Sequence, residues 1–254
     1  MDPGVSQLLV LCYHAISPTW SAGLSVTPEA FERQISSFAR TGWGSANFSD
    51  AVRGRPVGKT LVITFDDSFA SVKRYALPVL DRLGFTATVF APTDYISRQA
   101  PLAWTGLDHW VQTVDAAELT PMRWDDLGEL AERGWEVGSH TRTHPLLSTL
   151  SDDMLTAELE GSLQECVERM GRPISAIAYP YGDVDARVAR FAQGAGYQAA
   201  AALAWPTPEL NAYQFPRIGI YHKDSWPRFR LKAGRWLRSP YGSRLMALRS
   251  DRYR

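Results

Sequence analysis

The sequence has few cysteines, no excess charge of either sign and no long apolar run. Its 254 residues include two cysteines, Cys12 and Cys166, which is too few for a disulfide framework. Both lie within apolar patterns typical of buried free thiols. Lysine plus arginine and aspartate plus glutamate each total 27, so the net charge of zero supplies no overall attraction to nucleic acid. We therefore expect no nucleic-acid partner.

The sequence also lacks segments that direct a protein to a membrane. Residues 1–7 contain no basic region, and the apolar run that follows is too short for a signal-peptide core. No apolar stretch reaches the length of a membrane-spanning helix. These absences predict a cytoplasmic protein. The hydrophobic content of 45% is sufficient for the full core of one barrel, or of one to two ordinary domains.

Two adjacent carboxylates follow a predicted buried strand. Residues 60–63 form a short, apolar and partly β-branched run, and Asp66 and Asp67 come where that strand should end. Two close carboxylates in a buried place resist joint ionisation unless a cation or hydrogen-bond donors stabilise them. A metal ion would do so. The alternative is that one of the two aspartates is the N-cap of the following helix.

Two histidines four positions apart follow a second predicted strand, at residues 135–138. His140 and His144 can bind one ion through their imidazole nitrogens, and one carboxylate would complete a three-ligand set with open positions for water. A single histidine is more often an ordinary core or surface residue. The pair in combination with Asp66 and Asp67 indicates a hydrolytic metal site.

These motifs resemble those of the polysaccharide deacetylases, the NodB-homology group of carbohydrate esterases (carbohydrate esterase family 4). The segments Thr-Phe-Asp-Asp at 64–67, Ser-His-Thr-Arg-Thr-His at 139–144 and Tyr-Pro-Tyr-Gly at 179–182 have the order and spacing of that family, and the likeness extends from about residue 8 to about residue 221. The resemblance implies an α/β fold, a distorted (β/α) barrel of seven or eight strands. It also implies metal-dependent removal of acetyl groups from sugars, usually with Zn²⁺.

The resemblance assigns roles to several residues. Three of them would bind Zn²⁺ or another divalent ion: Asp67, His140 and His144. Asp66 would accept a proton from water, and His222, at the end of the last predicted strand at 218–222, is the best match to the family's general acid. Ser68 stands where the family most often has glycine, and we expect serine to be tolerated if the turn does not require a positive φ.

The turn at residues 179–182 is predicted to complete the catalytic site. Pro180 and the following glycine shape a turn that can direct the backbone N–H of Tyr181 outward as an oxyanion donor, with Pro180 beside the substrate. The family usually has an arginine two residues before this proline, where it steadies the catalytic aspartate, whereas this chain has Ala178. We expect another cation to act on Asp66 instead, with Arg217 the first candidate and Arg142 the second.

Further residues are candidates for substrate binding. His14 ends a predicted strand at 8–13, and that end of a barrel strand faces the active site. The alternative is a histidine hydrogen-bonded to a loop. A long connection, from about residue 91 to about residue 123, contains Trp104 and Trp110, whose faces can stack on sugar rings. The alternative is that both tryptophans only fasten the connection to the barrel.

Composition divides the chain into a barrel at residues 1–225 and a basic helix and tail at residues 226–254. The second segment has nine lysines or arginines and one acid, with apolar residues at helical spacing. We interpret it as a closing barrel helix followed by a basic tail. The alternative is peripheral contact with an anionic membrane surface.

Together these features predict a metal-dependent hydrolase that removes an N-acetyl or other N-acyl group from a carbohydrate. The absence of an export signal favours a lipid-linked or nucleotide-linked sugar as the acetylated substrate. Two alternatives stay open. One is an amidohydrolase that acts on a non-sugar amide on the same barrel, and the other is a catalytically inactive carbohydrate-binding member, which the missing arginine at Ala178 leaves conceivable.

Overall fold

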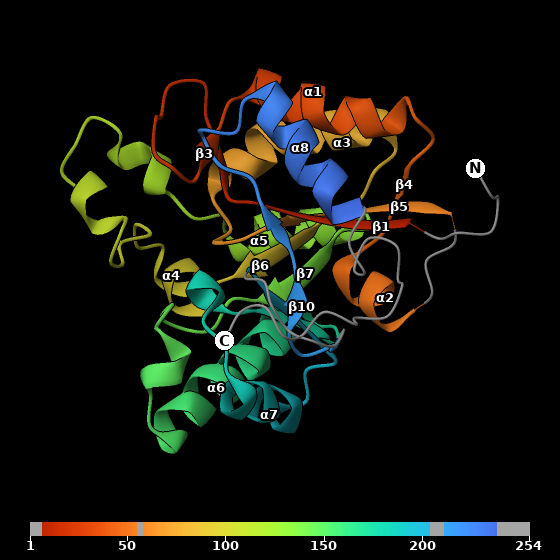
Figure 1. Cartoon of the computed structure of the whole chain (residues 1–254). Coiled ribbons are helices and arrows are strands. Elements are labelled where there is room, and N and C mark those ends of the chain that lie inside the picture. The colour runs from red at the N-terminus through yellow and green to blue at the C-terminus, as the bar shows by residue number, and fades with distance from the viewer. Residues whose placement is uncertain (1–6, 55–57, 204–210, 238–254) are drawn as a thin grey trace.

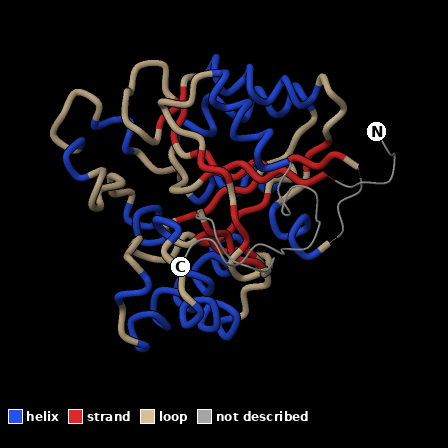
Figure 2. Tube along the Cα trace, viewed as in Figure 1, coloured by secondary structure: helices blue, strands red, loops and turns tan. Residues whose placement is uncertain are grey.

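Parallel strands lie at the centre of the molecule, and helices cover their outer side (Figure 1, Figure 2). This computed structural model describes residues 7–54, 58–203 and 211–237. The strands of the main sheet are β1 (Gln7–Tyr13), β4 (Gly44–Ser45), β5 (Lys59–Phe65), β6 (Thr88–Ala91), β7 (Glu136–Ser139), β8 (Ala176–Ala178), β9 (Ala199–Ala202), β10 (Phe215–Pro216) and β11 (Ile218–Gly219). A separate parallel pair is formed by β2 (Ala15–Ile16) and β3 (Ser25–Val26).

The main sheet curls into a nearly closed barrel. Its strands pair in the order β10-β9-β8-β7-β6-β5-β1-β11, and β4 pairs with β5 beside this path. Every pair between these strands is parallel. The path of eight strands confirms the distorted (β/α) barrel that the motifs predicted. Successive parallel strands must be joined by crossover connections, and the helices on the outside of the barrel supply them.

The helices connect the strands on the outer surface. They are α1 (Pro28–Ala39), α2 (Phe48–Arg53), α3 (Leu77–Leu83), α4 (Thr93–Arg98), α5 (Trp124–Glu132), α6 (Asp152–Met170), α7 (Ala186–Ala195) and α8 (Trp226–Leu237). Local signals begin and end several of them. Thr27 accepts a hydrogen bond from the backbone of Ala30 at the start of α1, and Ser151 caps α6 in the same way. Gly84 and Gly171 end α3 and α6 in the left-handed conformation.

The pairing of β1 with β5 brings two functional strand ends together. Both strands are buried apolar runs, as expected for parallel strands covered on both faces. Cys12 is opposite Thr64 and Tyr13 is opposite Phe65, at the last residues of the two strands. The residues that follow each strand therefore emerge side by side at the same end of the barrel.

The barrel closes at one short segment, residues 215–219. Its first half, β10, pairs with β9, whereas its second half, β11, pairs with β1. Only Arg217 lies between these two halves. This single segment thus joins the two edges of the sheet, and it places Arg217 at the seam of the barrel.

The last described helix belongs to the barrel's core. On α8, Phe229, Ala233 and Trp236 are buried, and the indole N–H of Trp236 donates to the carbonyl of Leu8 in β1 at 2.8 Å. The apolar stripe of α8 therefore faces the barrel, in accord with a closing helix. The division at residue 225 stays a prediction, and the basic tail at 238–254 lies outside the described residues. Among the described helices, none is both long enough and apolar enough to cross a membrane.

Candidate active site

The turn after β5 holds both aspartates in a buried and strained loop. Asp66 is 1% exposed and Asp67 is 2% exposed. Asp67 and Ser68 have φ angles of 69° and 54°, so this turn does require positive φ and the condition for an easily tolerated serine is not met. The hydroxyl of Ser68 donates to the carbonyl of Phe90 in β6 at 3.0 Å, which offsets part of the strain.

Positive φ angles outside glycine are concentrated around this turn. Among the described residues six non-glycine positions have them, and five lie at the site: Asp67, Ser68, Thr141, His144 and Tyr181. Such conformations cost roughly 1–3 kcal/mol each and persist where the surroundings enforce them, typically at active sites. The backbone is therefore strained at the loops that present the predicted motifs.

The three predicted metal ligands converge. The Oδ1 atom of Asp67 lies 3.3 Å from Nε2 of His140 and 3.4 Å from Nε2 of His144, and all three side chains are buried. Ligand atoms about 2.0–2.2 Å from a tetrahedral zinc ion lie roughly 3.3 Å from one another. Oδ1 of Asp67 has no hydrogen-bond partner within the described part of the chain. One carboxylate oxygen and two imidazole nitrogens thus fit a divalent cation in both distance and chemistry.

The residue at the position of the missing family arginine orients one of these ligands. Nδ1 of His140 is 2.8 Å from the backbone carbonyl of Ala178 at the end of β8. Because a carbonyl only accepts, Nδ1 carries the proton, and the lone pair of Nε2 is directed toward Asp67. Ala178 therefore contributes to the site through its backbone.

His144 is held by a tryptophan from the long connection. Its imidazole stacks on the ring of Trp104 with centroids 3.8 Å apart and planes 16° apart. The backbone N–H of His144 donates to Oγ1 of Thr141 at 3.1 Å. These contacts fix the ring of His144 with its Nε2 atom toward Asp67, so Trp104 does fasten the connection, and it does so at the site.

The charges of the three ligands depend on one another. Burial opposes ionisation of Asp67, but its contacts with His140 and His144 outweigh burial and lower the pKa of the carboxyl. Burial also favours the neutral form of both imidazoles. It lowers the pKa of His144, whereas the contact with Asp67 prevails at His140 and raises its pKa. The set offers an ionised carboxylate at neutral pH, as a cation site requires.

Arg217 reaches Asp66 from the seam of the barrel. Its two terminal nitrogens lie 2.7 Å from Oδ1 and 2.8 Å from Oδ2 of Asp66, a bidentate pair, and Nη1 also donates to Oγ1 of Thr64 at 2.9 Å. Burial of Asp66 opposes its ionisation, but Arg217 outweighs it and lowers the pKa of the carboxyl to about 2. The other candidate, Arg142, instead pairs with Asp94 at 3.3 Å and is partly exposed.

Sequence reasoning missed one side chain beside Asp66. The thiol of Cys12 donates to Oδ2 of Asp66 at 3.4 Å, and a ring nitrogen of His14 completes a buried group whose polar atoms lie within 4.8 Å of one another. The spacing in the sequence could have indicated Cys12. Alternate residues of a strand share a face, and Cys12 is two positions before His14. A second cation in this group would lie beside the buried guanidinium of Arg217, which opposes it.

The structure places the two histidines predicted near the substrate in different surroundings. His14 is buried, its ring faces that of Tyr221 at 6.2 Å, and its Nδ1 atom has no hydrogen-bond partner among the described residues. His222 is exposed, its backbone N–H donates to the carbonyl of Gly23, and its side chain lines a separate cavity. The histidine close to Asp66 is therefore His14.

A cavity of about 710 Å³ opens beside His144. Trp104, Leu146 and Tyr181 contribute to its walls, and the ring of Tyr181 meets that of His144 at 4.6 Å between centroids. Pro180, by contrast, is buried beneath this turn. Trp110 is not among the residues that line this cavity, because its ring packs edge-on against Trp20. The two tryptophans of the connection thus face different spaces.

Comparison with known proteins identifies the family. The family model for polysaccharide deacetylases matches residues 53–200, which is more than half of the chain and includes the aspartate turn and the histidine loop. The chain belongs to the polysaccharide deacetylase family. This result confirms the resemblance predicted from the motifs.

A curated relative agrees with the family assignment. YxkH of Bacillus subtilis (strain 168), provisionally named a polysaccharide deacetylase, is 25% identical over 198 residues, which are 76% of this chain and 63% of YxkH. The chain thus spans less than two thirds of that relative's length.

Solved structures share the barrel. The Streptococcus pyogenes deacetylase PplD, solved in complex with acetate, aligns with a TM-score of 0.74 at 22% identity and covers 91% of this chain and 99% of PplD. The polysaccharide deacetylase BC0361 of Bacillus cereus aligns with a TM-score of 0.70 at 24% identity and covers 89% of this chain and 69% of BC0361. These similarities establish the fold.

The part of the chain that matches the family model does not contain the whole cluster around Asp66. Cys12, His14 and Arg217 all lie outside residues 53–200, yet they surround that carboxylate. The metal-ligand set is local to the matched segment, whereas the environment of Asp66 is assembled from both ends of the described chain.

Proposed function

We propose that this polysaccharide deacetylase is a metal-dependent hydrolase that removes an N-acetyl or other N-acyl group from a carbohydrate. One observation carries the proposal. Asp67, His140 and His144 converge within the reach of a single ion, while the adjacent Asp66 is held ionised outside that ligand set. Two neighbouring carboxylates thereby have two different surroundings, as acid–base chemistry next to a metal ion requires.

Asp67, His140 and His144 are the residues that would hold Zn²⁺ or another divalent ion. Such an ion, when bound, would lower the pKa of a water molecule and polarise the acyl oxygen of the substrate. The chain's own contribution is to fix the ligand geometry through Ala178 and Trp104, and to exclude bulk solvent from the buried ligands.

Asp66 accepts the proton of the attacking water in this mechanism. A carboxylate has about four lone-pair positions, of which Arg217 uses one on each oxygen and Cys12 uses a second one on Oδ2. The remaining position is on Oδ1, so we assign Oδ1 as the proton acceptor. Because the pKa of Asp66 is about 2, the carboxyl is ionised across the whole working pH range.

His14 donates a proton to the leaving nitrogen in this proposal, a role that the family resemblance had suggested for His222. Water adds to the acyl carbon, the C–N bond breaks, and the amine leaves with the proton that His14 supplies. Burial lowers the pKa of His14, so its imidazole is neutral at the start. The neutral imidazole takes up the proton that Asp66 accepts from water and, as imidazolium, gives one N–H proton to the leaving nitrogen, so both groups return to their starting states.

The cavity beside His144 suits a sugar ring. Trp104 and Tyr181 line this cavity and both contact the imidazole of His144, and the backbone N–H of Tyr181 is the predicted oxyanion donor. The aromatic walls favour a carbohydrate over a small non-sugar amide. PplD was solved with acetate, the second product expected of such a reaction. The cytoplasmic location and the membrane contact of the basic tail stay predictions.

Removal of the metal ion tests the function directly. We expect the full-length protein to release acetate from N-acetylated chito-oligosaccharides, and exhaustive chelation to reduce the rate by on the order of 100-fold or more. Added Zn²⁺ should restore activity in the native protein and should not do so in Asp67→Ala. Undiminished acetate release by chelated protein, with its metal content measured as zero, would sink the proposal. Stoichiometric metal binding without turnover of any acylated sugar would support the inactive binding member.

The assignment of the proton donor is tested by comparing two histidine variants. His14→Gln should lower kcat by roughly 10²-fold, because it removes a proton donor next to Asp66. His222→Gln, the matched control, should change kcat by less than about threefold, because His222 is exposed outside both clusters. The measurement is acetate release at saturating substrate. A larger loss in His222→Gln than in His14→Gln would return the role to His222.

A further inference from the structure

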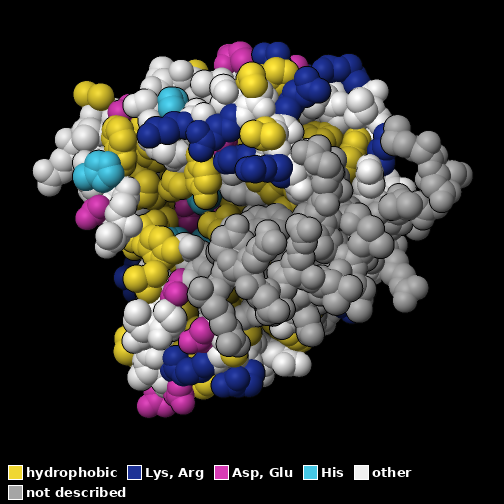
Figure 3. All heavy atoms as spheres, in the orientation of Figure 1, with side chains coloured by type: hydrophobic (Ala, Val, Ile, Leu, Met, Phe, Trp, Pro, Cys, Tyr) yellow, Lys and Arg dark blue, Asp and Glu magenta, His cyan; other side chains and the backbone are white. Residues whose placement is uncertain are grey.

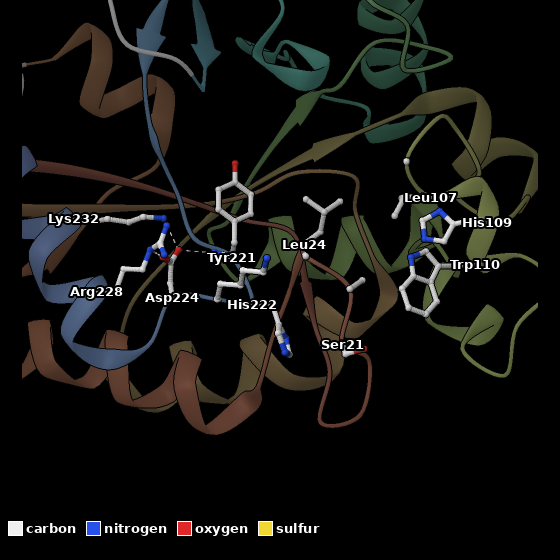
Figure 4. Close-up of a pocket in the computed structure, with 14 residues that line it drawn as sticks. Ser21, Leu24, Leu107, His109, Trp110, Tyr221, His222, Asp224, Arg228 and Lys232 are labelled. Carbon is white, nitrogen blue, oxygen red and sulfur yellow. Dashed lines mark hydrogen bonds and ion pairs between the residues drawn. The ribbon is translucent and has the colours of Figure 1, made fainter.

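A second cavity, of about 630 Å³, lies on the other side of residues 104–110 from the cavity beside His144. Gly106, Leu107, His109 and Trp110 line this second cavity, whereas Trp104, Thr105 and Asp108 line the first. The remaining walls come from the loop at 21–24 and from residues 221–232, which include the start of α8 (Figure 4). The two cavities are therefore separated by one short stretch of chain.

One wall of the second cavity is cationic. Its residues include three cations and one carboxylate: Lys223, Arg228, Lys232 and Asp224. Asp224 is 7% exposed, and its oxygens meet Nζ of Lys232 at 2.5 Å and Nε of Arg228 at 3.0 Å, as the dashed lines in Figure 4 show. The carboxylate positions both cations but neutralises the charge of only one. In the view of Figure 3, Lys and Arg side chains form a band across the upper part of the molecule.

The guanidinium of Arg228 has donors to spare. It meets Asp224 through Nε, which leaves the four N–H bonds of the two terminal nitrogens for another acceptor. The side chain of Arg228 is 60% exposed, so that acceptor can arrive from solvent. Lys223 is also exposed and lines the same cavity. A tetrahedral anion with several oxygens matches such a set of donors.

The opposite wall is aromatic. His109 and Trp110 project from their turn toward the cavity across from Arg228 and Lys232 (Figure 4). The indole of Trp110 is held edge-on by Trp20, with ring centroids 5.6 Å apart. An aromatic face opposite a cationic wall suits a ligand that carries a ring and an anionic group together.

The cavity lies near the reaction centre, with Tyr221 between the two. Tyr221 lines the cavity, and its ring centroid is 6.2 Å from that of His14, which lies in one cluster with Asp66. The first cavity approaches the same centre from the side of His144. A sugar whose acyl group lies at Asp66 could thus extend a substituent into the cationic cavity without leaving the barrel mouth.

We propose that the second cavity binds the phosphate group of a phosphorylated N-acyl sugar, with Arg228 and Lys223 as the donors and Trp110 as the surface opposite them. This inference rests on the proposed deacetylase function, because the phosphate is a substituent of that substrate. A neutral polysaccharide would have no use for a cavity lined by three cations and one carboxylate. Nucleotide-linked and lipid-linked sugars both carry phosphate, and the cations of the cavity would bind that shared group in either one.

Calorimetric binding of inorganic pyrophosphate to the full-length chain tests the site without any need for turnover. The Arg228→Gln, Lys223→Gln double variant should bind this probe on the order of tenfold or more weakly than the native protein. Asp224 keeps its partner Lys232 in this variant, so its buried carboxylate is not left unpaired. Arg230→Gln is the matched control, because Arg230 is exposed on the same helix and does not line the cavity.

Each outcome decides the inference. Loss of pyrophosphate binding in the double variant alone supports the site, whereas equal affinity in all three proteins, or no binding by the native protein, overturns it. Two ligands then distinguish a nucleotide-linked from a lipid-linked substrate. They are a nucleoside diphosphate-linked N-acetylglucosamine and the same sugar joined through pyrophosphate to a short isoprenol, and the one that binds more tightly identifies the substrate class. Weaker binding of both than of free pyrophosphate would overturn a substrate site. Pyrophosphate binding without acetate release from any sugar would support the phosphate site and refute the deacetylase function.

Discussion

Asp66→Asn is expected to reduce the rate of deacetylation by roughly 10²- to 10⁴-fold, the range for loss of a general base. The amide cannot accept the proton of the attacking water at the position that Oδ1 offers. Binding of Zn²⁺ should persist, because Asp67, His140 and His144 form the ligand set without Asp66. The measurement combines acetate release with metal content after dialysis.

Two further variants make this result specific. Asp67→Asn should lose both metal and activity, whereas Asp81→Asn should keep both, since Asp81 forms only a partly exposed pair with Arg133 on the outer surface. Circular dichroism on each variant checks that the barrel has formed. Should Asp66→Asn retain more than about a tenth of the native rate while folded and metal-loaded, another group must be the base.

Arg217→Met is expected to destabilise the protein by about 3–5 kcal/mol, because it leaves the buried carboxylate of Asp66 without its bidentate partner. Methionine fills a similar length of the interior, so the loss reports charge rather than a large cavity. The measurement is urea unfolding at neutral pH. Arg142→Met, which breaks a partly exposed pair with Asp94, should cost less than about 1 kcal/mol.

The loss of stability in Arg217→Met should depend on pH. In the native protein the pKa of Asp66 is about 2, below its unfolded value, so the carboxylate contributes stability that is present above about pH 4 and is lost as the pH falls toward 2. Without Arg217 the largest influence that opposes burial is lost and the pKa of Asp66 rises, so the variant is destabilised most at neutral pH and regains stability as Asp66 takes up a proton. The difference in stability should therefore shrink in acid. A difference that stays constant from pH 7 to pH 4 would show that packing, not charge, is lost.

Local patterns were enough to place most barrel elements and to group the candidate metal ligands. The apolar run before Asp66 was predicted as a buried strand and forms β5. The helix caps Thr27, Ser151 and Gly84 likewise depend only on neighbours in sequence. Residues that directly follow parallel strands meet at one end of a barrel. The convergence of Asp67 with two histidines some seventy positions away follows from that rule.

The closing segment and the environment of Asp66 could not be derived in this way. The last strand was expected at 218–222, but the pairing instead covers 215–219 and is divided at Arg217. A two-residue strand is too short to show an alternating hydrophobic pattern. Its position is set by the strands with which it pairs on either side of the seam. For the same reason His14 and His222 could not be ranked from sequence. Both follow strands that pair with each other, and only the folded structure shows which imidazole is buried beside Asp66.

The division of the closing segment around Arg217 links activity to the completion of folding. During synthesis the aspartate turn emerges some 150 residues before its guanidinium partner, so a nascent or truncated chain has no counter-charge for Asp66. The proposed hydrolytic centre would therefore be complete only when the last edge of the sheet is in place. Loss of residues 215–219 would remove both the closing strands and the cation that pairs with Asp66, so we expect a protein cleaved there to be inactive.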